Sequence, residues 1–483
     1  MDIWDKTPNI IVDRRPLWVV ILDRVRRPLL LGLIFSLFFI LLAQEGPSDL
    51  SAEGYKVLCV FFLCVSLWST NVIPLSITSL LAIATIPLLG IMDASAVYSF
   101  FGNKAVFFIL GAFILSAAMI GSGFSIRLSM WVMETFGANP GRLVGSIYGF
   151  GAVSSCFMTE HAVAAMLFPL TLEIVKSLDL SQKDSRFAKA MFFAMAWGCI
   201  IGGAATVLGG GRVPLAGEIL ETATDGASTI GFMEYSLLAV PLVILLLASG
   251  WLVLRVMFPP DLSNIGQARV VLREKHQALG KMSFQEKGIA VVMTLTLYLW
   301  FVHSETLGIA NIAMLSIVVL FVLNLVNWKM VENHINWAII LMYGGAICLG
   351  EVMAQSGAAL WLAKQIFEGT LESAAAFLII IAVCSTLLTT FMSNSAVIAI
   401  LLPPAISLCP AYDISPAVAA MTVVLPSNFA FILPIATPAS ALAYSSRYIS
   451  LGEMIRAGSL LALFGMGSYL FLLLVYWPLI GFE

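Results

Sequence analysis

A carboxylate and an imidazole stand side by side in a stretch of the chain that is otherwise apolar. The stretch reads "FMTEHAVAAMLFPL" at 157–170, and only Thr159 adds its polarity to that of Glu160 and His161. A lone charge at the centre of a bilayer costs about 2.5–3.5 kcal/mol, so such residues usually face a cavity and are paired. Adjacent residues of a helix point in different directions, which argues against a metal ion shared by the two.

The composition of the whole chain indicates a membrane protein. The 483 residues are 60% hydrophobic and 11% charged, against roughly 25% charged residues in a soluble globular protein. Apolar runs such as 29–42, 236–258 and 459–482 approach or exceed the ~20 residues that a helix needs to cross the hydrocarbon. The polar, basic N-terminus does not resemble a cleavable signal. The seven cysteines have neither metal-ligand nor redox spacing, so we expect no disulfide framework.

The apolar runs predict an all-α polytopic membrane protein with about eleven transmembrane helices. We expect them near 28–44, 54–71, 74–92, 105–122, 188–222 with an interruption, 233–257, 286–303, 307–327, 335–354, 417–446 with an interruption, and 457–481. Two further regions, 141–177 and 373–408, are apolar but broken in the middle by polar residues. This pattern predicts two re-entrant hairpins, whose irregular backbone must be covered by protein or line a water-filled cavity.

The basic residues predict which side of the membrane each end of the chain faces. Ten of the 25 lysines and arginines lie in two segments, the tail 1–27 and the linker 259–285: Lys6, Arg14, Arg15, Arg24, Arg26, Arg27, Arg269, Arg273, Lys275 and Lys281. By the positive-inside rule both segments are cytoplasmic. An odd number of spans then places the C-terminus outside, and we expect an integral protein of the bacterial inner membrane.

The linker separates two halves, 28–258 and 286–483, that resemble each other. The segments "FMTEHAVAAMLFP" from 157 and "FMSNSAVIAILLP" from 391 match without a gap at an offset of 234 residues. An odd number of spans lies between equivalent points, so the halves are predicted to be inverted-topology repeats. Such repeats with interrupted helices at matching positions are typical of secondary transporters, whose site lies where the repeats meet.

Each half contributes two breaks in its apolar sequence. They are "MTEHA" (158–162) and "IGGAATVLGGGRVP" (201–214), then "MSNSA" (392–396) and "NFAFILPIATPASA" (428–441). Glycine and proline free backbone groups at such breaks. Freed N–H groups and helix N-termini bind anions, whereas freed carbonyls bind cations such as Na⁺. Four convergent breaks therefore favour a small anion with a coupled cation.

On these motifs the chain resembles the divalent anion/sodium symporter family, the dicarboxylate and sulfate carriers. The matching stretches are "SNS" (393–395) and "FILPIATPAS" (431–440). The resemblance implies a homodimer of elevator-type transporters, each with a scaffold part and a mobile transport part. It implies that Ser393, Asn394, Ser395, Thr437 and Pro438 bind substrate. It further implies a sodium site formed by Asn394, Ala436 and Pro438.

The first half departs from the family pattern. Its tip reads "TEH" where Ser-Asn-Thr is expected, and its interrupted helix reads "GGGR" (209–212) where a Pro-Pro-Asn ending is expected. Thr159 keeps a hydroxyl, and Gly202 and Gly203 keep an open backbone for a cation. Glu160, His161 and Arg212 stand where neutral groups surround sodium and substrate, and we include them with Thr159 among the expected substrate-binding residues.

The resemblance places Glu160 and Arg212 close together, and two roles are open for them. The pair could only brace the hairpin against the interrupted helix. Alternatively, Arg212 could take over part of the work of Na⁺, because its planar fork suits a carboxylate or sulfate. Uncompensated positive charge at Arg212 would make the empty site costly to move and would favour exchange of one anion for another.

The leading hypothesis is a secondary-active transporter of divalent anions, with C4-dicarboxylates or related carboxylates as first choice. We expect an elevator mechanism, reduced or lost sodium dependence at the first site, and favoured anion exchange. The alternative is a sodium- or proton-coupled symporter of sulfate or another inorganic divalent anion. Na⁺ is the only candidate coupling ion or cofactor besides the proton, and nucleic acid is not an expected partner. No nucleophile–base or metal constellation favours an enzyme.

Overall fold

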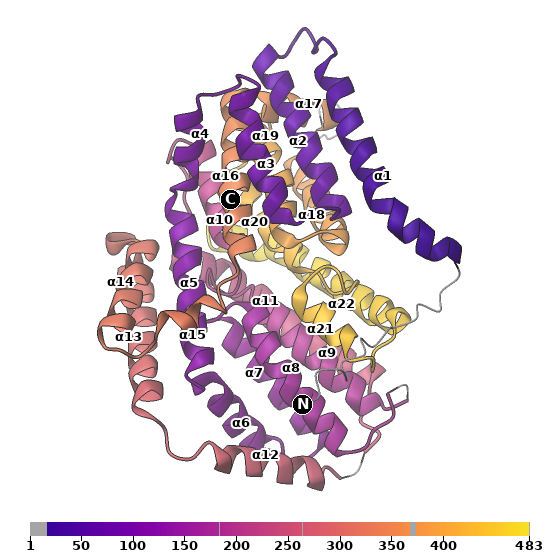
Figure 1. Ribbon diagram of the computed structural model, residues 1–483, viewed down its shortest axis with the longest axis vertical. Coiled ribbons are helices and arrows are strands. Elements are labelled where there is room, and N and C mark those ends of the chain that lie inside the picture. The colour runs from indigo at the N-terminus through magenta and orange to yellow at the C-terminus, as the bar shows by residue number, and fades with distance from the viewer. Residues whose placement is uncertain (1–16, 183, 263, 368–372, 483) are drawn as a thin grey trace, which may run out of the picture.

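The computed structural model describes residues 17–182, 184–262, 264–367 and 373–482, and every regular element within them is a helix (Figure 1). Residues 1–16 of the expected tail, with Lys6, Arg14 and Arg15, lie outside the described residues. The all-α class predicted from the sequence is confirmed.

The first half of the described chain contains eleven helices. They are α1 (Leu17–Leu42), α2 (Ala52–Thr70), α3 (Leu75–Leu88), α4 (Ala94–Phe101), α5 (Lys104–Gly121), α6 (Phe124–Phe136), α7 (Pro140–Ser155), α8 (Glu160–Ser177), α9 (Arg186–Gly202), α10 (Arg212–Ala223) and α11 (Phe232–Met257). Helix α1 begins earlier than the span expected near 28, so Arg24, Arg26 and Arg27 lie on this helix rather than in an extended tail.

The linker and the second half contain the remaining elements. They are α12 (Gly266–Ala278), α13 (Phe284–Leu307), α14 (Ile309–Val322), α15 (Trp328–Glu332), α16 (Trp337–Gln355), α17 (Ala358–Phe367), α18 (Ala374–Phe391), α19 (Asn394–Tyr412), α20 (Pro416–Val424), the 3₁₀ turn η1 (Pro426–Asn428), α21 (Pro438–Ser445), α22 (Leu451–Phe471), the π turn η2 (Leu472–Tyr476) and α23 (Trp477–Leu479). The linker is therefore largely helical, with Ala268 and Leu272 of α12 buried against α6 and α8.

The described chain has nine helical segments long and apolar enough to cross a membrane, and two shorter apolar helices, α3 and α14. Two of the nine are α18 and α19, the arms of the second expected hairpin. The other segments, together with the helix pairs α9–α10 and α20–α21, coincide with the eleven expected spans. How many of them cross the bilayer stays a prediction.

Both expected hairpins are pairs of helices joined by very short turns. In the first hairpin, α7 and α8, the helix α8 begins after Thr159, whose backbone is extended with φ −64° and ψ 136°. In the second hairpin, α18 and α19, Ser393 plays the same part with φ −67° and ψ 146°. A hydroxyl residue in extended backbone is the usual residue before a helix. Thr159 and Ser393, which are paired in the sequence match, therefore have nearly the same backbone conformation, although the turn before Thr159 is longer.

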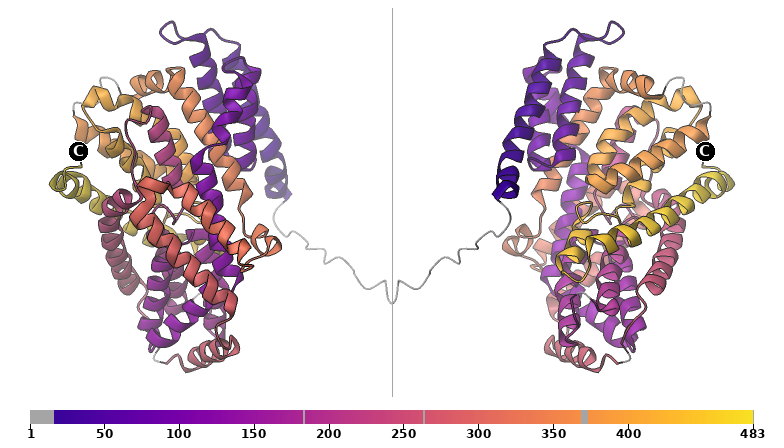
Figure 2. Two further views of the ribbon diagram at one scale, coloured as in Figure 1. Left: turned by 90° about the vertical axis from the view of Figure 1, so that its left-hand side faces the viewer. Right: turned by 90° about the vertical axis from the view of Figure 1, so that its right-hand side faces the viewer.

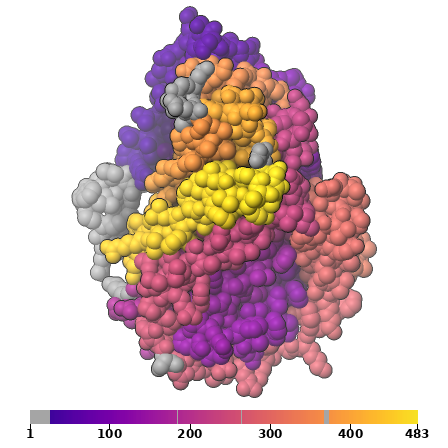
Figure 3. All heavy atoms as spheres, turned by 180° about the vertical axis from the view of Figure 1, so that it is seen from behind, coloured from indigo at the N-terminus to yellow at the C-terminus, as the bar shows by residue number. Residues whose placement is uncertain are grey.

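The helices form an elongated molecule with two groups at its ends (Figure 1). Helices α1 to α4 lie with α16 to α20 at one end, and α6 to α9 lie with α12 at the other. Helices α13 and α14 lie together on the outside, where α14 packs against α5 (Figure 2). Helix α22 crosses the rear face beside α11 (Figure 3). The groups meet in the middle, where the broken segments are found.

Helix α9 lies at the centre of the molecule and is almost completely buried. Arg186 is exposed and Lys189 is partly buried, whereas its other residues are buried. Its glycines allow the closest helix contact in this region: a Cβ at Gly198 would lie 2.4 Å from the carbonyl oxygen of Tyr148, and one at Gly202 2.1 Å from that of Ala152. Small residues commonly permit such close packing between membrane helices. Helix α7, one arm of the first hairpin, therefore packs directly on α9, and this contact holds the hairpin in place.

Candidate functional site

The two hairpins and the two interrupted helices exchange partners between the halves. The first interrupted helix consists of α9 and α10 joined by 203–211, and the second of α20 and α21 joined by 425–437. Helix α8 packs against α9 of its own half and against α21 of the other, while α19 packs against α20 of its own half and against α10 of the other. This arrangement brings both hairpin tips and both interruptions to one place.

A cavity of about 270 Å³ lies at this meeting point. All nine residues predicted to bind substrate line it, and the structure thus brings them together: Thr159, Glu160, His161, Arg212, Ser393, Asn394, Ser395, Thr437 and Pro438. The interrupted loops add Gly210, Gly211 and Ala436, and the far wall is built from α3, α5 and α16. The contacts of these residues indicate which kind of ligand the cavity suits.

Four helices begin at residues that line this cavity. They start at Glu160 (α8), Arg212 (α10), Asn394 (α19) and Pro438 (α21). The first backbone N–H groups of a helix have no acceptor within the helix, and the helix dipole adds partial positive charge there. Ser393 and Thr437 cap two of these starts by accepting from the N–H groups of Ala396 and Ser440 at 3.3 and 3.2 Å. The cavity is therefore electrically suited to an anion.

Glu160 and Arg212, which the family resemblance placed close together, form an ion pair. Arg212 Nη1 donates to Glu160 Oε2 at 3.2 Å, and the two side chains are only 3% and 1% exposed. The backbone N–H of Glu160 also donates to the carbonyl oxygen of Gly209 at 2.9 Å. The first tip and the first interrupted loop are thus joined by one charged and one backbone hydrogen bond. Removing one partner of such a buried pair is costly because the other charge stays uncompensated.

The guanidinium of Arg212 keeps two buried donors without an acceptor. Within the described residues, Arg212 Nε and Nη2 have no hydrogen-bond partner, and the residue borders the cavity. A buried donor without a partner costs about 1–3 kcal/mol. The pairing with Glu160 neutralises the charge of Arg212 but leaves part of its planar fork free. An anion in the cavity is the natural acceptor for that part.

His161 lies beside the ion pair rather than inside it. Its Nδ1 atom is 3.5 Å from Glu160 Oε1, and its ring is 31% exposed. The ring also borders a neighbouring cavity of about 340 Å³, which is lined by Thr159, Asn336 and His334 as well. His161 therefore lines both the cavity of the hairpin tips and this neighbouring cavity.

The second tip is held by a network of neutral polar groups. Tyr343 Oη lies 3.0 Å from Ser395 Oγ. Thr389 Oγ1 lies 2.8 Å from both Asn394 Oδ1 and the carbonyl oxygen of Ser427. A hydroxyl has a single proton and can donate to only one of these oxygens. If the hydroxyl donates to Ser427, turning the Asn394 amide over lets its NH₂ group donate to Thr389 and frees its oxygen for another partner.

The five residues predicted to bind a cation are placed differently in the two halves. Asn394, Ala436 and Pro438 line the cavity. Gly202 and Gly203 do not: Gly202 rests on α7, and a Cβ at Gly203 would lie 2.9 Å from Glu160 Oε2. The carboxylate of Glu160 thus lies against the backbone that was expected to face a cation in the first half.

Tyr343 lines the cavity but was not among the residues predicted from the sequence. A Cβ at Gly211 would stand 1.9 Å from Tyr343 Oη, so the interrupted loop lies directly against α16. The signal that could have found Tyr343 is its phenol within the apolar run "AIILMYGGAICLG" (338–350), because a buried phenol normally has a hydrogen-bond partner. Most of the remaining lining residues, such as Phe113 and Met342, are apolar and gave no signal, whereas Asn336 is polar.

Comparison with known proteins places the chain among anion transporters. The sequence model of the sodium:sulfate symporter transmembrane region matches residues 27–482. The sodium-dependent dicarboxylate transporter SdcS of Staphylococcus saprophyticus is 28% identical over 490 residues, covering 94% of this chain and 92% of the relative. The protein of the same name from Staphylococcus aureus is 28% identical over 480 residues, with 93% and 91% covered.

A solved structure shares the fold. The crystal structure of the Alcanivorax borkumensis YdaH transporter, described as having an unusual topology, matches with a TM-score of 0.51 at 18% sequence identity. The match covers 81% of this chain and 90% of that one. At this level of identity the likeness concerns the fold alone.

Proposed function

The chain belongs to the sodium:sulfate symporter family and is a membrane transporter, and we propose that it carries C4-dicarboxylates or related carboxylates by secondary-active transport. The observation that carries this proposal is the cavity that Arg212, with two donors lacking an acceptor within the described residues, shares with the hydroxyl-rich second tip. A dicarboxylate has two ends that can accept from both. The relatives named for dicarboxylate transport support the same choice.

We propose that Arg212 takes over the role of a first sodium ion. It brings a fixed positive charge to the first tip, and the backbone of Gly203 is in contact with Glu160 instead of facing open space. The second half retains Asn394, Ala436 and Pro438 at the cavity, so one sodium ion remains the candidate coupling ion there. Transport by this chain is therefore less dependent on sodium than the family pattern of two sodium sites implies.

Exchange of one anion for another is favoured in this proposal, for a reason that differs from the one the sequence suggested. The Glu160 carboxylate offsets the charge of Arg212, so the empty site carries no net charge from this pair. It still contains two buried donors without a partner, at a cost of about 1–3 kcal/mol each. A bound carboxylate accepts from them and lowers the cost of closing the site, whereas the empty carrier returns slowly.

The wider mechanism follows the fold. We propose that the hairpins and interrupted helices form a transport part that moves as an elevator against α1 to α5 and α13 to α16. The exchange of partners between α8, α21, α10 and α19 supports two inverted repeats, 28–258 and 286–483. A homodimer, a cytoplasmic N-terminus and linker, and an outer C-terminus complete the proposal. The bond of Lys189 to Glu453 at 2.6 Å supports a common side for the starts of α9 and α22.

Coupling to protons is a second candidate, favoured by the position of His161. This imidazole lies 3.5 Å from the Glu160 carboxylate and is partly exposed, so it could carry a proton between the cavity and the buried acid. A proton on Glu160 would release Arg212 to the substrate. Uptake would then follow an imposed pH gradient, and the dependence would disappear in Glu160→Gln.

Counterflow in proteoliposomes tests the main proposal. Vesicles containing the purified protein are loaded with unlabelled succinate or left empty, and labelled succinate is added outside in sodium-free buffer. We expect rapid uptake into loaded vesicles, slow uptake into empty ones, and competition by malate rather than sulfate. Uptake into empty vesicles that depends strictly on sodium would refute the exchange proposal. Preferential transport of sulfate would support the alternative of an inorganic anion symporter.

A further inference from the structure

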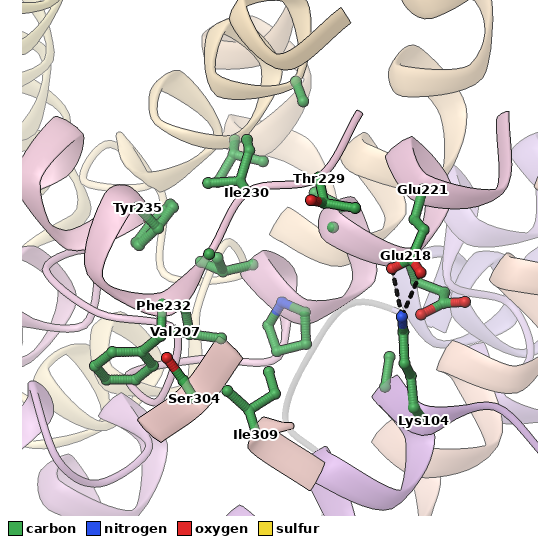
Figure 4. Close-up of a pocket in the computed structure, with 18 of the residues that line it drawn as sticks. Lys104, Val207, Glu218, Glu221, Thr229, Ile230, Phe232, Tyr235, Ser304 and Ile309 are labelled. Atoms are coloured by element: carbon green, nitrogen blue, oxygen red, sulfur yellow. Dashed lines mark hydrogen bonds and ion pairs between the residues drawn. The ribbon is translucent and has the colours of Figure 1, made fainter. Parts of the chain in front are cut away.

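A second and larger cavity, of about 400 Å³, lies further along α10 and shares no lining residue with the first. It is bounded by five segments: the start of α5, the length of α10, the loop into α11, the corner between α13 and α14, and α20 (Figure 4). Its size falls within the roughly 300–1,000 Å³ of small-molecule sites. Nothing in the proposed transport of dicarboxylates uses it.

The walls of this cavity are apolar, and its charged groups are mainly acidic. Val213, Phe232, Ile309, Met421 and Val424 are among the residues that provide the apolar surface. The charged lining residues are Lys104, Glu218, Glu221 and Glu305. Figure 4 shows Lys104 bonded to Glu221, and these two charges offset each other. The lining therefore has an excess of acidic groups, with Lys104 as its one basic residue against three glutamates.

Glu218 is the acidic group best placed to select a ligand. It is 8% exposed, and its carboxylate accepts a hydrogen bond from the amide Nδ2 of Asn103. An amide hydrogen bond brings no charge, and the nearby Lys104 ammonium is bonded to Glu221 rather than to Glu218. Burial beside apolar walls strengthens the attraction of the Glu218 carboxylate for a cation. The same charge repels the dianions that the protein is proposed to carry.

We infer that this cavity binds an amphipathic organic cation, an ammonium group on an apolar chain. The ammonium would lie beside Glu218, and the chain would lie along the apolar residues of α10, α11 and α20. An inorganic cation fits poorly, because the described residues hold no group of three or more His, Cys, Asp or Glu side chains able to bind a metal ion. The ligand chemistry is shared by free alkylamines and by lipids with an ethanolamine head group.

Occupancy of the cavity would slow transport without competing with substrate, a consequence that rests on the proposed function. Helices α10 and α20 belong to the proposed transport part, whereas α5, α13 and α14 belong to the scaffold. A ligand that contacts both holds them together. Glu218 lies about 9 Å along α10 from Arg212, by the rise of a helix, so the ligand does not occupy the substrate cavity.

The test measures the binding of octylamine to the purified protein by calorimetry, with octanoate as the matched anion. Glu218→Gln keeps the shape of the side chain and removes its charge. Gly217→Phe fills the cavity, because nothing lies within 4 Å of a Cβ at Gly217. Glu45→Gln, an exposed acid away from the cavity, is the control. The melting temperature of each variant shows that it is folded.

We expect octylamine to bind the wild type and Glu45→Gln equally, at least tenfold more weakly to Glu218→Gln, and not at all to Gly217→Phe. Octanoate should not bind. Equal binding to all four proteins would show partition into detergent or lipid and would overturn the inference, as would equal binding of octanoate. Slower anion exchange with added octylamine in the wild type but not in Gly217→Phe is expected, and unchanged exchange would refute the inhibitory role.

Two further measurements separate the possible sources and failures. Reconstitution with and without phosphatidylethanolamine distinguishes the lipid from the free amine: octylamine affinity falls in the presence of the lipid if the lipid occupies the cavity. A thermal-shift assay with succinate tests the substrate site separately. Loss of the succinate response with retained octylamine binding would refute the proposed transport function and leave the second site standing.

Discussion

Gly211 of the first interrupted loop lies against the phenol of Tyr343 on α16, so that a Cβ at Gly211 would stand 1.9 Å from Tyr343 Oη. The same hydroxyl lies 3.0 Å from Ser395 Oγ at the second hairpin tip. One phenol therefore touches the interrupted loop of the first half and the tip of the second. It closes the cavity between parts of the chain that are far apart in sequence.

Gly211→Ala should disrupt this junction. The added methyl group overlaps the Tyr343 ring, and overpacking of this kind costs about 1–3 kcal/mol. We expect a lower melting temperature and much slower exchange in proteoliposomes. Gly149→Ala, where nothing lies within 4 Å of the Cβ, is the control and should behave as wild type. Adding Tyr343→Ala to Gly211→Ala should recover stability, and a failure to do so would argue against this contact as the cause.

Tyr343→Phe isolates the hydrogen bond from the shape of the ring. It removes the hydroxyl that lies 3.0 Å from Ser395 Oγ and leaves the packing in place. A neutral hydrogen bond contributes about 0.5–1.5 kcal/mol, so succinate affinity should fall by up to roughly tenfold. Isothermal titration with succinate measures the change. An unchanged affinity would show that Ser395 does not need this orientation to bind the anion.

The Glu160–Arg212 pair can be separated into a bracing role and a binding role. Glu160→Gln and Arg212→Gln each leave a buried charge without its partner, at a cost of about 3–5 kcal/mol, and the double variant should be more stable than the sum predicts. Thermal unfolding in detergent measures the stability of the three variants.

Arg212→Lys distinguishes the two roles. Lysine keeps the charge near Glu160 but lacks the planar fork, whose Nε and Nη2 have no acceptor within the described residues. If these donors hold the substrate, succinate affinity falls at least tenfold while the protein stays folded. If the pair only braces the hairpin, succinate affinity stays within twofold of wild type.

Thr389 should control the remaining sodium response. Its hydroxyl lies 2.8 Å from Asn394 Oδ1 and orients the amide that is proposed to face sodium. Thr389→Ala should lower the apparent sodium affinity of uptake. Thr390→Ala is the matched control, because that hydroxyl donates to the Thr386 carbonyl oxygen at 3.1 Å within its own helix. A Hill coefficient for sodium above one would contradict a single site.

Arg127 should be irreplaceable by lysine for stability. Its Nε and Nη2 atoms donate to the two oxygens of Glu286 at 2.8 and 3.3 Å, and its Nη1 donates to the Gly280 carbonyl oxygen at 2.8 Å. A lysine cannot form this fork. We expect a lower melting temperature for Arg127→Lys and no change for the exposed Arg142→Lys. Equal melting temperatures would show that the linker does not depend on this contact.

Much of the fold could be predicted from local pattern. Long runs of apolar residues predict membrane-spanning helices, because the length and composition of each run determine how costly its exposure to water would be. The match between 157–169 and 391–403 identified both hairpin tips, and all nine predicted substrate residues line one cavity. The linker helix α12 and the early start of α1 were not predicted, because neither segment contains a long apolar run.

The sequence by itself determined that Glu160, His161 and Arg212 lie where charge is costly, because the residue types and the apolar residues around them can be read directly from the sequence. Only the tertiary structure decided how that cost is met. Three features depend on side-chain packing between distant segments. Arg212 reaches Glu160 through Nη1, Gly203 lies against the Glu160 carboxylate, and α10 packs on the hairpin of the other half. Such packing has no local pattern, since it arises only when the helices meet.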